Sequence, residues 1–289
     1  MQISGFTFVR NAVKFDYPVV ESITSILPIV DEFIVSVGNS EDQTPALIRS
    51  INSPKIKIID SVWDDSLKTG GKVLAAETDK AFARLSANSD WAFYLQADEI
   101  LHERYLETIQ RATRKYLNDS SVEGLLFNYL HFYGTYDYTG DSRRWYNREI
   151  RIIRNNKAIR SYLDAQGFRI SGRKLRVKPV DACIYHYGWV KPPEVQMQKI
   201  YNTFNFWGGD DLSKPATRED TFNYLNDADS LVKFTDSHPE VMKERIRQKN
   251  WEVDFDLTRK KLSLKNNLLY RIEKITGVRL FDYKNYRII

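Results

Sequence analysis

The stretch FYLQADEIL, residues 93–101, is the part of the sequence from which the fold and the site are best predicted. The apolar and aromatic residues at 91–95 are typical of a short buried strand, and a polar cluster follows at once. Acidic side chains directly after a strand stand where open α/β sheets bind ligands. Asp98 and Glu99 offer hard oxygen atoms, which suit Mg²⁺ or Mn²⁺ better than a soft metal. The simpler alternative is that Asp98 only caps the helix that follows.

Strand patterns alternate with helical patterns before this stretch. Strands are predicted at 3–9, 32–37, 56–59 and 91–95, with a helical segment between each pair. Such alternation predicts a parallel sheet that is covered by helices. Because the carboxyl ends of parallel strands share one edge, we expect three polar segments to gather there: Arg10-Asn11, Asn39 to Asp42, and Gln96 to Glu99. That convergence favours a ligand-binding role for Asp98 over a helix cap.

After residue 117, strands follow one another without long helices between them. They are predicted at 124–133, 149–153, 169–170, 175–177 and 182–186, and residues 134–144 are predicted as a polar loop. Beyond Pro192, helical spacing runs from Met197 to Trp207, and further helices are predicted near 222–234, 239–251 and 265–276. We therefore predict an α/β fold whose parallel-to-mixed central sheet is flanked by helices. The predicted domains are 1–191, with halves 1–101 and 102–191, and a helical C-terminal region at 192–289.

Composition limits the class of protein. The chain has 289 residues, of which 42% are hydrophobic and 13% aromatic, so a sizeable core is expected and wholesale disorder is excluded. Its one cysteine, Cys183, cannot form an internal disulfide, and no Cys/His zinc spacing is present. The N-terminus lacks the pattern of a signal peptide, and no apolar run approaches the roughly 18 residues of a membrane span. These features predict a cytoplasmic protein.

The excess positive charge lies near the C-terminus. The net charge is +5, and residues 240–289 hold 13 Lys and Arg against 7 Asp and Glu. A basic tail can meet phosphates, anionic lipid or an acidic partner, or can be a solvated helical face. The predicted helix at 265–276 places Leu268, Leu269, Ile272 and Ile275 on one side, as an interfacial helix does. We expect peripheral contact with the inner face of a membrane, although a helix packed on its own domain fits the same pattern.

The order of the polar motifs resembles a known family. Val9-Arg10-Asn11, the segment Ser40 to Thr44, a Gly-Gly helix entry at 70–71 and Gln96-Ala97-Asp98-Glu99 resemble the inverting glycosyltransferases of family 2, which have the GT-A nucleotide-sugar fold. The similarity is to the bacterial group that builds lipopolysaccharide core and other surface glycans, whose signature is Asp-Ala-Asp-Glu. Residues 185–189 (YHYGW) are similar to that group's downstream histidine motif. The resemblance covers about residues 3–200.

The resemblance implies transfer of a sugar, with inversion, from a nucleotide-sugar donor to a glycan or lipid-linked acceptor during surface polysaccharide synthesis. It also implies a divalent ion, Mn²⁺ or Mg²⁺, held by Asp98 and His186, which would neutralise the leaving diphosphate. A structural role for the histidine is the simpler alternative. The residues expected to bind the nucleotide sugar are Arg10, Asn11, Asn39, Asp42, Lys72, Gln96 and Asp98.

The chain departs from the family pattern at two places. Gln96 stands where the family has its first aspartate, so that position brings a hydrogen-bonding amide but no charge. The turn at 37–39 lacks the paired aspartates by which relatives read uracil, so the nucleobase stays open. Asn39 could read the base or be only a turn residue.

An inverting transfer needs a general base that takes a proton from the acceptor hydroxyl. Relatives place a carboxylate between the metal motif and the downstream histidine, and Asp164 is the nearest candidate. Asp181 and the pair Asp210-Asp211 are alternatives, and Asp164 could instead be a surface turn residue. The arginine-rich run at 143–154 could hold the diphosphate or an anionic acceptor. No nucleic-acid motif accompanies it, so no nucleic-acid partner is expected.

Two rival functions stay open at the level of sequence. A sugar-nucleotide nucleotidyltransferase would favour a Gly-rich basic loop after the first strand, and Arg10-Asn11-Ala12 lacks one. A catalytically degenerate glycan- or nucleotide-binding protein is motivated by Gln96.

Overall fold

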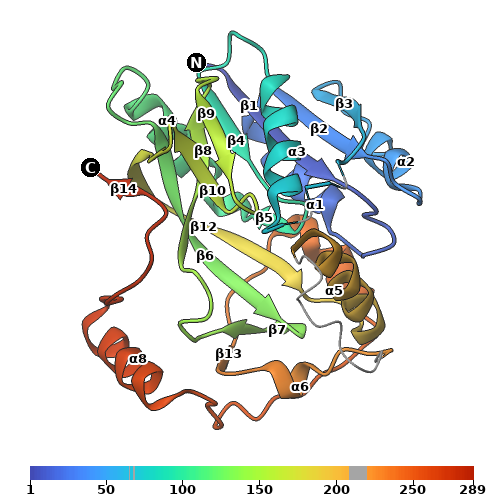
Figure 1. The fold of residues 1–289 in the computed structure, drawn as a ribbon, viewed down its shortest axis with the longest axis vertical. Helices are drawn as coiled ribbons and strands as arrows, with labels where there is room; N and C mark the ends of the chain where they lie inside the picture. The colour runs from blue at the N-terminus through green and yellow to red at the C-terminus, as the bar shows by residue number, and fades with distance from the viewer. Residues whose placement is uncertain (65, 68, 208–219) are drawn as a thin grey trace.

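The N-terminal strands form one parallel layer, as the alternating sequence pattern predicts. The computed structural model describes residues 1–64, 66–67, 69–207 and 220–289, and these strands stand in the order β4-β1-β2-β3 (Figure 1). Neighbouring strands of this layer pair in parallel, so their carboxyl ends share one edge of the sheet. Their bounds are β1 Ile3–Val9, β2 Glu32–Gly38, β3 Ile56–Ser61 and β4 Trp91–Tyr94.

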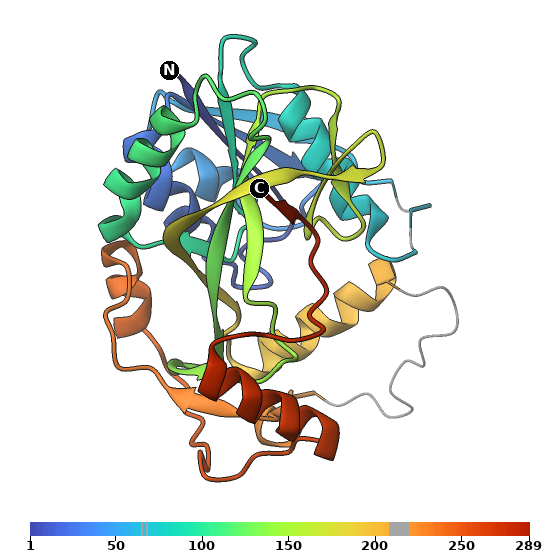
Figure 2. The same ribbon diagram turned by 90° about the vertical axis from the view of Figure 1, so that its left-hand side faces the viewer.

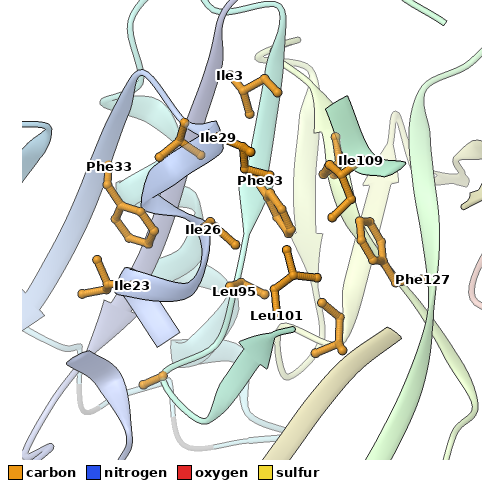
Figure 3. Close-up of a cluster of buried hydrophobic side chains, with 14 of the residues drawn as sticks. Ile3, Ile23, Ile26, Ile29, Phe33, Phe93, Leu95, Leu101, Ile109 and Phe127 are labelled. Atoms are coloured by element: carbon orange, nitrogen blue, oxygen red, sulfur yellow. The ribbon is translucent and has the colours of Figure 1, made fainter. Parts of the chain in front are cut away.

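Helices cover both faces of this layer, which explains why its strands read as continuous apolar runs. Successive strand residues alternate between two cores. Phe93 belongs to the cluster that contains Ile23 and Ile26 (Figure 3), whereas Tyr94 belongs to the cluster that contains Phe82. The first core is closed by α1 Val19–Ile26, the 3₁₀ turn Leu27–Ile29, α2 Thr44–Arg49 and α4 Leu106–Lys115, and the second by α3 Lys72–Ala83.

The second half of the chain extends the same sheet with mixed polarity, as predicted. β8 pairs antiparallel with β4, and the sheet continues through β6 and β7 to β13. A small separate sheet has the order β11-β10-β9. The bounds are β6 Gly124–Tyr133, β7 Thr135–Gly140, β8 Arg148–Arg154, β9 Ile159–Tyr162, β10 Gly167–Ile170 and β11 Arg173–Lys174.

One long strand carries the downstream histidine to the turn after β4. β12, Arg176–Trp189, joins the two strands that the sequence predicts at 175–177 and 182–186, because its ladder tolerates Pro179 through a register shift. It runs parallel to β6 and antiparallel to β5, Glu99–Leu101. In this register His186 lies opposite both Glu99 and His131.

The C-terminal region is less helical than predicted. The predicted loop at 134–144 contains β7, and the predicted helix at 222–234 is replaced by the short α6 and β13, which pairs with β7. The predicted helix at 239–251 shrinks to a 3₁₀ turn and α7, whereas the one at 265–276 is confirmed as α8. The bounds are α5 Pro193–Trp207, α6 Tyr224–Asp227, β13 Leu231–Lys233, the 3₁₀ turns Glu103–Tyr105 and Glu240–Met242, α7 Lys243–Arg247, α8 Leu264–Thr276 and β14 Arg287–Ile288.

The strands β13 and β14 both add to the central sheet, so residues of the C-terminal region complete the fold of the N-terminal part. Within the described part of the chain, no helix combines the length and the apolar character that crossing a bilayer requires.

Candidate active site

The turn after β4 is built on a buried ion pair. Glu99 and Arg151 are both fully buried, and the guanidinium donates from Nε to Oε2 at 2.7 Å and from Nη2 to Oε1 at 2.6 Å. The Glu99 carboxylate also accepts the Tyr129 hydroxyl at 2.9 Å and the backbone N–H of Gln96 at 3.0 Å. Because both of its oxygens are used in this way, Glu99 fixes the turn. The neighbouring carboxylate, Asp98, instead borders the cavities of this region.

Asp98 is an ionised, nearly buried carboxylate with cations around it. Its side chain lies 3.3 Å from Nζ of Lys199 through Oδ2 and 3.7 Å from Nε2 of His186 through Oδ1. Burial alone would raise its pKa, but nearby positive charge, above all that of Lys199, lowers the pKa to about 2. Asp98 is therefore negatively charged at neutral pH and is suited to bind a cation.

A chain of hydrogen bonds fixes the tautomer of His186. His131 Nε2 lies 2.7 Å from the carbonyl oxygen of Tyr146, which can only accept, so Nε2 carries the hydrogen. Burial lowers the pKa of His131 well below its usual value, which leaves its Nδ1 as an acceptor. His186 Nδ1, 3.0 Å away, must then donate to it. Burial also lowers the pKa of His186, so its Nε2 presents a lone pair towards Asp98.

The space between these two groups is kept open by a glycine. A Cβ at Gly188 would lie 2.6 Å from Nε2 of His186 and 2.7 Å from Oδ2 of Asp98. A nitrogen lone pair and a carboxylate oxygen thus face one another across a space that any other residue at 188 would fill. Imidazole and carboxylate are donors that suit Mn²⁺. The described residues hold no group of three or more such side chains, so these two would share a divalent ion with ligands from a substrate, with Lys199 as a competing cation.

Two cavities open on either side of Asp98. The first, of about 190 Å³, is lined by residues that follow β1, β3 and β4, by the segment before α1 and by α5, among them Arg10, Tyr17, Trp63, Gln96 and Asn202. The second, of about 530 Å³, is lined by Tyr146, Asp164, Gln166, His186, Trp189 and Phe204, among others. Asp98, Gln96, Lys199, Leu74 and Thr203 border both, so the two cavities are lobes of one cleft.

The structure brings together only some of the residues that the sequence predicts for nucleotide-sugar binding. Arg10, Gln96 and Asp98 line the smaller lobe. Asn11 and Asp42 instead hold the loops together: Asn11 accepts the backbone N–H of Glu41 at 2.8 Å, and Asp42 accepts that of Thr44 at 3.0 Å and that of Lys14 at 2.7 Å.

Asn39 and Lys72 are exposed and stand outside the described residues that line the two lobes. Asn39 accepts the backbone N–H of Trp63 at 3.4 Å, which joins the turn after β2 to the loop after β3. Lys72 is the first residue of α3, and it follows two glycines of positive φ.

Asp164, the predicted base, lies on the wall of the larger lobe. It sits in the loop between β9 and β10, between Leu163 and Ala165, which have φ of 53° and 65°. Non-glycine residues in this region are strained, and such strain persists where the surroundings enforce it. Burial raises the pKa of Asp164. Asp181 is exposed on β12, and Asp210 and Asp211 lie outside the described residues.

Two lysines near Asp98 were missed at the level of sequence. Lys199 lies on α5, which the sequence indicates only as a packing helix, and its Nζ also donates to the carbonyl oxygen of Gly188 at 2.8 Å. Lys191 is fully buried and donates to the carbonyl oxygen of Asp16 at 2.7 Å. Burial lowers the pKa of Lys191 to about 7. Lys199 shares its helix face with Gln196, Asn202 and Thr203, and this polar face of α5 was the available signal for it.

The arginine-rich run at 143–154 serves the fold. Arg154 stacks over Trp91 at 3.8 Å and donates to the carbonyl oxygen of Val122 at 3.0 Å, and Arg148 donates to Asn128 at 3.1 Å. Acidic side chains pair with the remaining members, which are Arg143 with Glu273, Arg144 with Asp227 and Arg151 with Glu99.

Comparison with known proteins gives distant structural matches. No family model and no curated protein matches the chain. A fragment of TarS from S. aureus matches over 70% of this chain and 64% of that one, with 12% identity and a TM-score of 0.38. Its complex with UDP-GlcNAc matches over 46% and 36%, with 15% identity and a TM-score of 0.34.

Glucosyl-3-phosphoglycerate synthase from Mycobacterium tuberculosis, solved with Mn²⁺, UDP and phosphoglyceric acid, matches over 45% of this chain and 43% of that one, with 17% identity and a TM-score of 0.31. The chain thus spans less than two thirds of the length of each structure. At such distance the matches carry no argument about activity, which must rest on this chain's own residues.

Proposed function

We propose that the protein is a metal-dependent, inverting glycosyltransferase of the GT-A type, similar to family 2, that moves a sugar from a nucleotide donor to a glycan or lipid-linked acceptor in surface polysaccharide synthesis. The observation that carries this proposal is the ionised Asp98 at the carboxyl end of the parallel layer, which faces the lone pair of His186 across the space beside Gly188. A cleft with one lobe on each side of that carboxylate suits a reaction that joins two substrates.

The donor would occupy the smaller lobe. Phe8 and Trp63 give this lobe an apolar wall for a nucleobase, and Arg10, whose guanidinium lies 5.5 Å from the centre of the Trp63 ring, offers a charged donor for phosphate. The amide of Gln96 can hydrogen-bond a ribose hydroxyl without adding charge. Lys199 and Arg10, which line this lobe, supply positive charge for a diphosphate.

Asp98 and His186 would hold the divalent ion, which when bound neutralises charge on the departing diphosphate. The protein's own part is to keep Asp98 ionised and to keep His186 in the tautomer that has its lone pair on Nε2. The charges of the neighbouring lysines keep Asp98 ionised, and the bond to His131 keeps the lone pair of His186 on Nε2. Lys199 supplies further positive charge from α5.

The acceptor would occupy the larger lobe. Tyr146, Trp189 and Phe204 give it aromatic and apolar walls, which suit sugar rings and lipid-like groups. Asp164 is the proposed base that takes the proton of the attacking hydroxyl. Its raised pKa favours proton uptake, because a more basic carboxylate accepts a proton more readily at a given pH.

A panel of nucleotide sugars, assayed for transfer and for donor hydrolysis with and without Mn²⁺, tests the proposal. We expect turnover with one class of donor and its loss in Asp98→Ala. Full transferase activity in that variant would refute the assignment. The ion pair between Lys199 and Asp98 favours a second candidate, a protein that binds the nucleotide without transferring the sugar. Nucleotide binding without turnover across the panel would support that candidate.

A further inference from the structure

The exposed apolar side chains of the protein gather in its C-terminal segment. Most of the large apolar residues that are exposed in the described chain lie between 264 and 288. On α8 they form a stripe, with Leu264 at 93%, Leu268 at 62% and Ile275 at 85% exposure. These positions share one helix face. Leu269 and Ile272, which the sequence places on the same apolar side, are half-buried in the structure.

The other face of α8 is fixed to the protein. Tyr270 and Lys274 both hydrogen-bond the carboxylate of Asp141 at 2.5 Å, and Glu273 pairs with Arg143 at 2.9 Å. The helix is therefore held in place with its apolar stripe turned away from the sheet. A helix that only packed on its own domain would hide that stripe, so the position of the stripe calls for an external contact.

Phe281 follows the helix and adds a strained, protruding ring. It has φ of 56° and is 90% exposed. A bulky residue in the left-handed region is strained, and a ring in solvent gains no packing in return. Tyr283, 69% exposed, lies two residues further on, beneath the ammonium of Lys174 at 4.9 Å. Backbone strain that no packing of the side chain offsets is typical of segments that contact a ligand or partner.

A basic cavity adjoins the ring of Tyr283, because Lys174 contacts that ring and lines the cavity. It measures about 800 Å³, and five of its lining residues are cationic: Arg173, Lys174, Arg176, Lys284 and Arg287. Glu123 pairs with Arg173 and Arg176. Lys284 and Arg287 have no side-chain partner within the described ranges, and the backbone of both belongs to the tail that leads to β14. The cavity thus keeps uncompensated positive charge.

Most of these features belong to one C-terminal segment, and β14 brings its end to the start of β12, where the other basic residues of the cavity lie. Figure 2 shows α8 and the tail to β14 on the side turned to the viewer, across the start of β12. The nearby acidic groups are already neutralised, since Asp282 pairs with Arg279 at 3.3 Å and Glu273 with Arg143.

We propose that α8 and the tail at 278–288, together called the C-terminal face, dock onto the surface of an anionic phospholipid bilayer.

The chemistry of the face matches that of a bilayer surface. Apolar tips that protrude singly, with cations beside them, enter the interfacial region while lysine and arginine heads meet phosphate groups. Lys265 is exposed beside the stripe of α8, and Arg271 is exposed within it, on the same helix face as Leu268 and Ile275. A second copy of this chain would bring the same positive charge to the interface, so self-association is disfavoured.

The docked face lies next to the larger lobe of the cleft. Asn285 is buried in the tail, and its side chain lies so close to Gly167 that a Cβ there would clash with its amide nitrogen. Gln166, the preceding residue, lines the lobe. This part of the inference rests on the proposed function: a bilayer on this face would bring lipid-linked acceptors to the acceptor side.

Vesicle co-sedimentation of the full chain tests the docking without reference to activity. We expect binding to vesicles that mix phosphatidylcholine with phosphatidylglycerol and weak binding to phosphatidylcholine alone. Phe281→Ser should weaken binding roughly tenfold. Lys284→Gln with Arg287→Gln should weaken it roughly 25-fold, since each basic residue contributes about fivefold near an anionic surface. High salt should reduce the binding of the wild type.

Matched controls lie elsewhere on the surface. Val62 is 74% exposed near β3, and Arg111 and Arg114 are exposed on α4, so Val62→Ser and the double variant Arg111→Gln, Arg114→Gln should leave binding unchanged. Equal binding to both kinds of vesicle, or equal losses in the controls, would overturn the docking. Dimerisation in solution that Phe281→Ser abolishes, in a protein that does not bind vesicles, would also overturn the docking. Vesicle binding by a chain without transferase activity would overturn only the proposed function.

Discussion

Lys199 Nζ lies 3.3 Å from Oδ2 of Asp98, on the carboxylate that we propose as the ligand of a divalent ion. The same ammonium also donates to the carbonyl oxygen of Gly188, which borders the open space between Asp98 and His186. The lysine therefore has two opposite effects. It repels a metal ion from Asp98, and it attracts the diphosphate that such an ion would accompany.

Lys199→Met separates these effects, since methionine retains much of the aliphatic side chain without the charge. We expect Mn²⁺ to bind the free protein more tightly, because the competing cation is gone. Nucleoside diphosphate binding without metal should weaken roughly tenfold, as loss of one charge-assisted hydrogen bond predicts. Isothermal titration measures both affinities. Unchanged affinities for both ligands would show that Lys199 acts on neither.

Gly188→Ala tests whether the space beside Asp98 is a cation site. The new methyl group would lie within 2.7 Å of both proposed ligands, so one of them must shift. We expect Mn²⁺ binding, followed by the electron paramagnetic resonance of the free ion, to fall by at least roughly tenfold. Gly188 is not among the residues of positive φ, so alanine is compatible with its backbone, and the melting temperature serves as the control for folding. Normal metal binding in this variant would place the ion elsewhere.

The hydrogen bond from His186 to His131 makes a separate prediction. His131→Phe removes the acceptor for Nδ1–H, so the proton of His186 can move to Nε2 and block the lone pair. Loss of such a supporting contact costs roughly 10–100-fold in metal affinity. His131→Asn keeps an acceptor oxygen and should restore most of that affinity. Equal weakening by both substitutions would mean that His131 supports packing between Tyr129 and Trp145 rather than the tautomer.

Much of the parallel layer could be predicted because its signals are local. Buried strands such as β1 and β4 show as apolar runs, and the carboxyl ends of such strands must meet at one edge. That geometry led to Asp98, whereas the expectation for His186 came from the resemblance. The pairing of β12 with β5 and β6 brings the two side chains to 3.7 Å from one another.

The remaining features depend on contacts between distant segments. β13 is three residues long and forms only because β7 offers an edge, so its sequence alone favoured a helix. The sequence also does not show whether a polar residue binds a ligand or only holds a loop in place. Asn11 and Asp42 carry the same chemistry as a site residue, yet they satisfy backbone N–H groups of loops that only the folded sheet brings together.

Glu149 provides a prediction about stability. It is 5% exposed on β8, and its Oε2 has no hydrogen-bond partner within the described residues. Burial raises its pKa to about 8, helped by the nearby charges of Glu99 and Asp164 and opposed by Arg151. The unfolded chain releases this proton near pH 4.3. Between that pH and about 8 the folded state binds more protons than the unfolded state, so the free energy of unfolding falls as pH rises.

Glu149→Gln removes this dependence, because glutamine is neutral at every pH and closely matches the protonated acid in shape. The variant should resemble the wild type at pH 5 and should exceed it at pH 8 by a few kcal/mol, on the order of 1.4 kcal/mol for each pH unit between the two pKa values. Urea unfolding across this range measures the difference. Glu107→Gln on the exposed surface of α4 is the control and should leave the slope unchanged. A wild-type slope retained in Glu149→Gln would assign the pH dependence to another group.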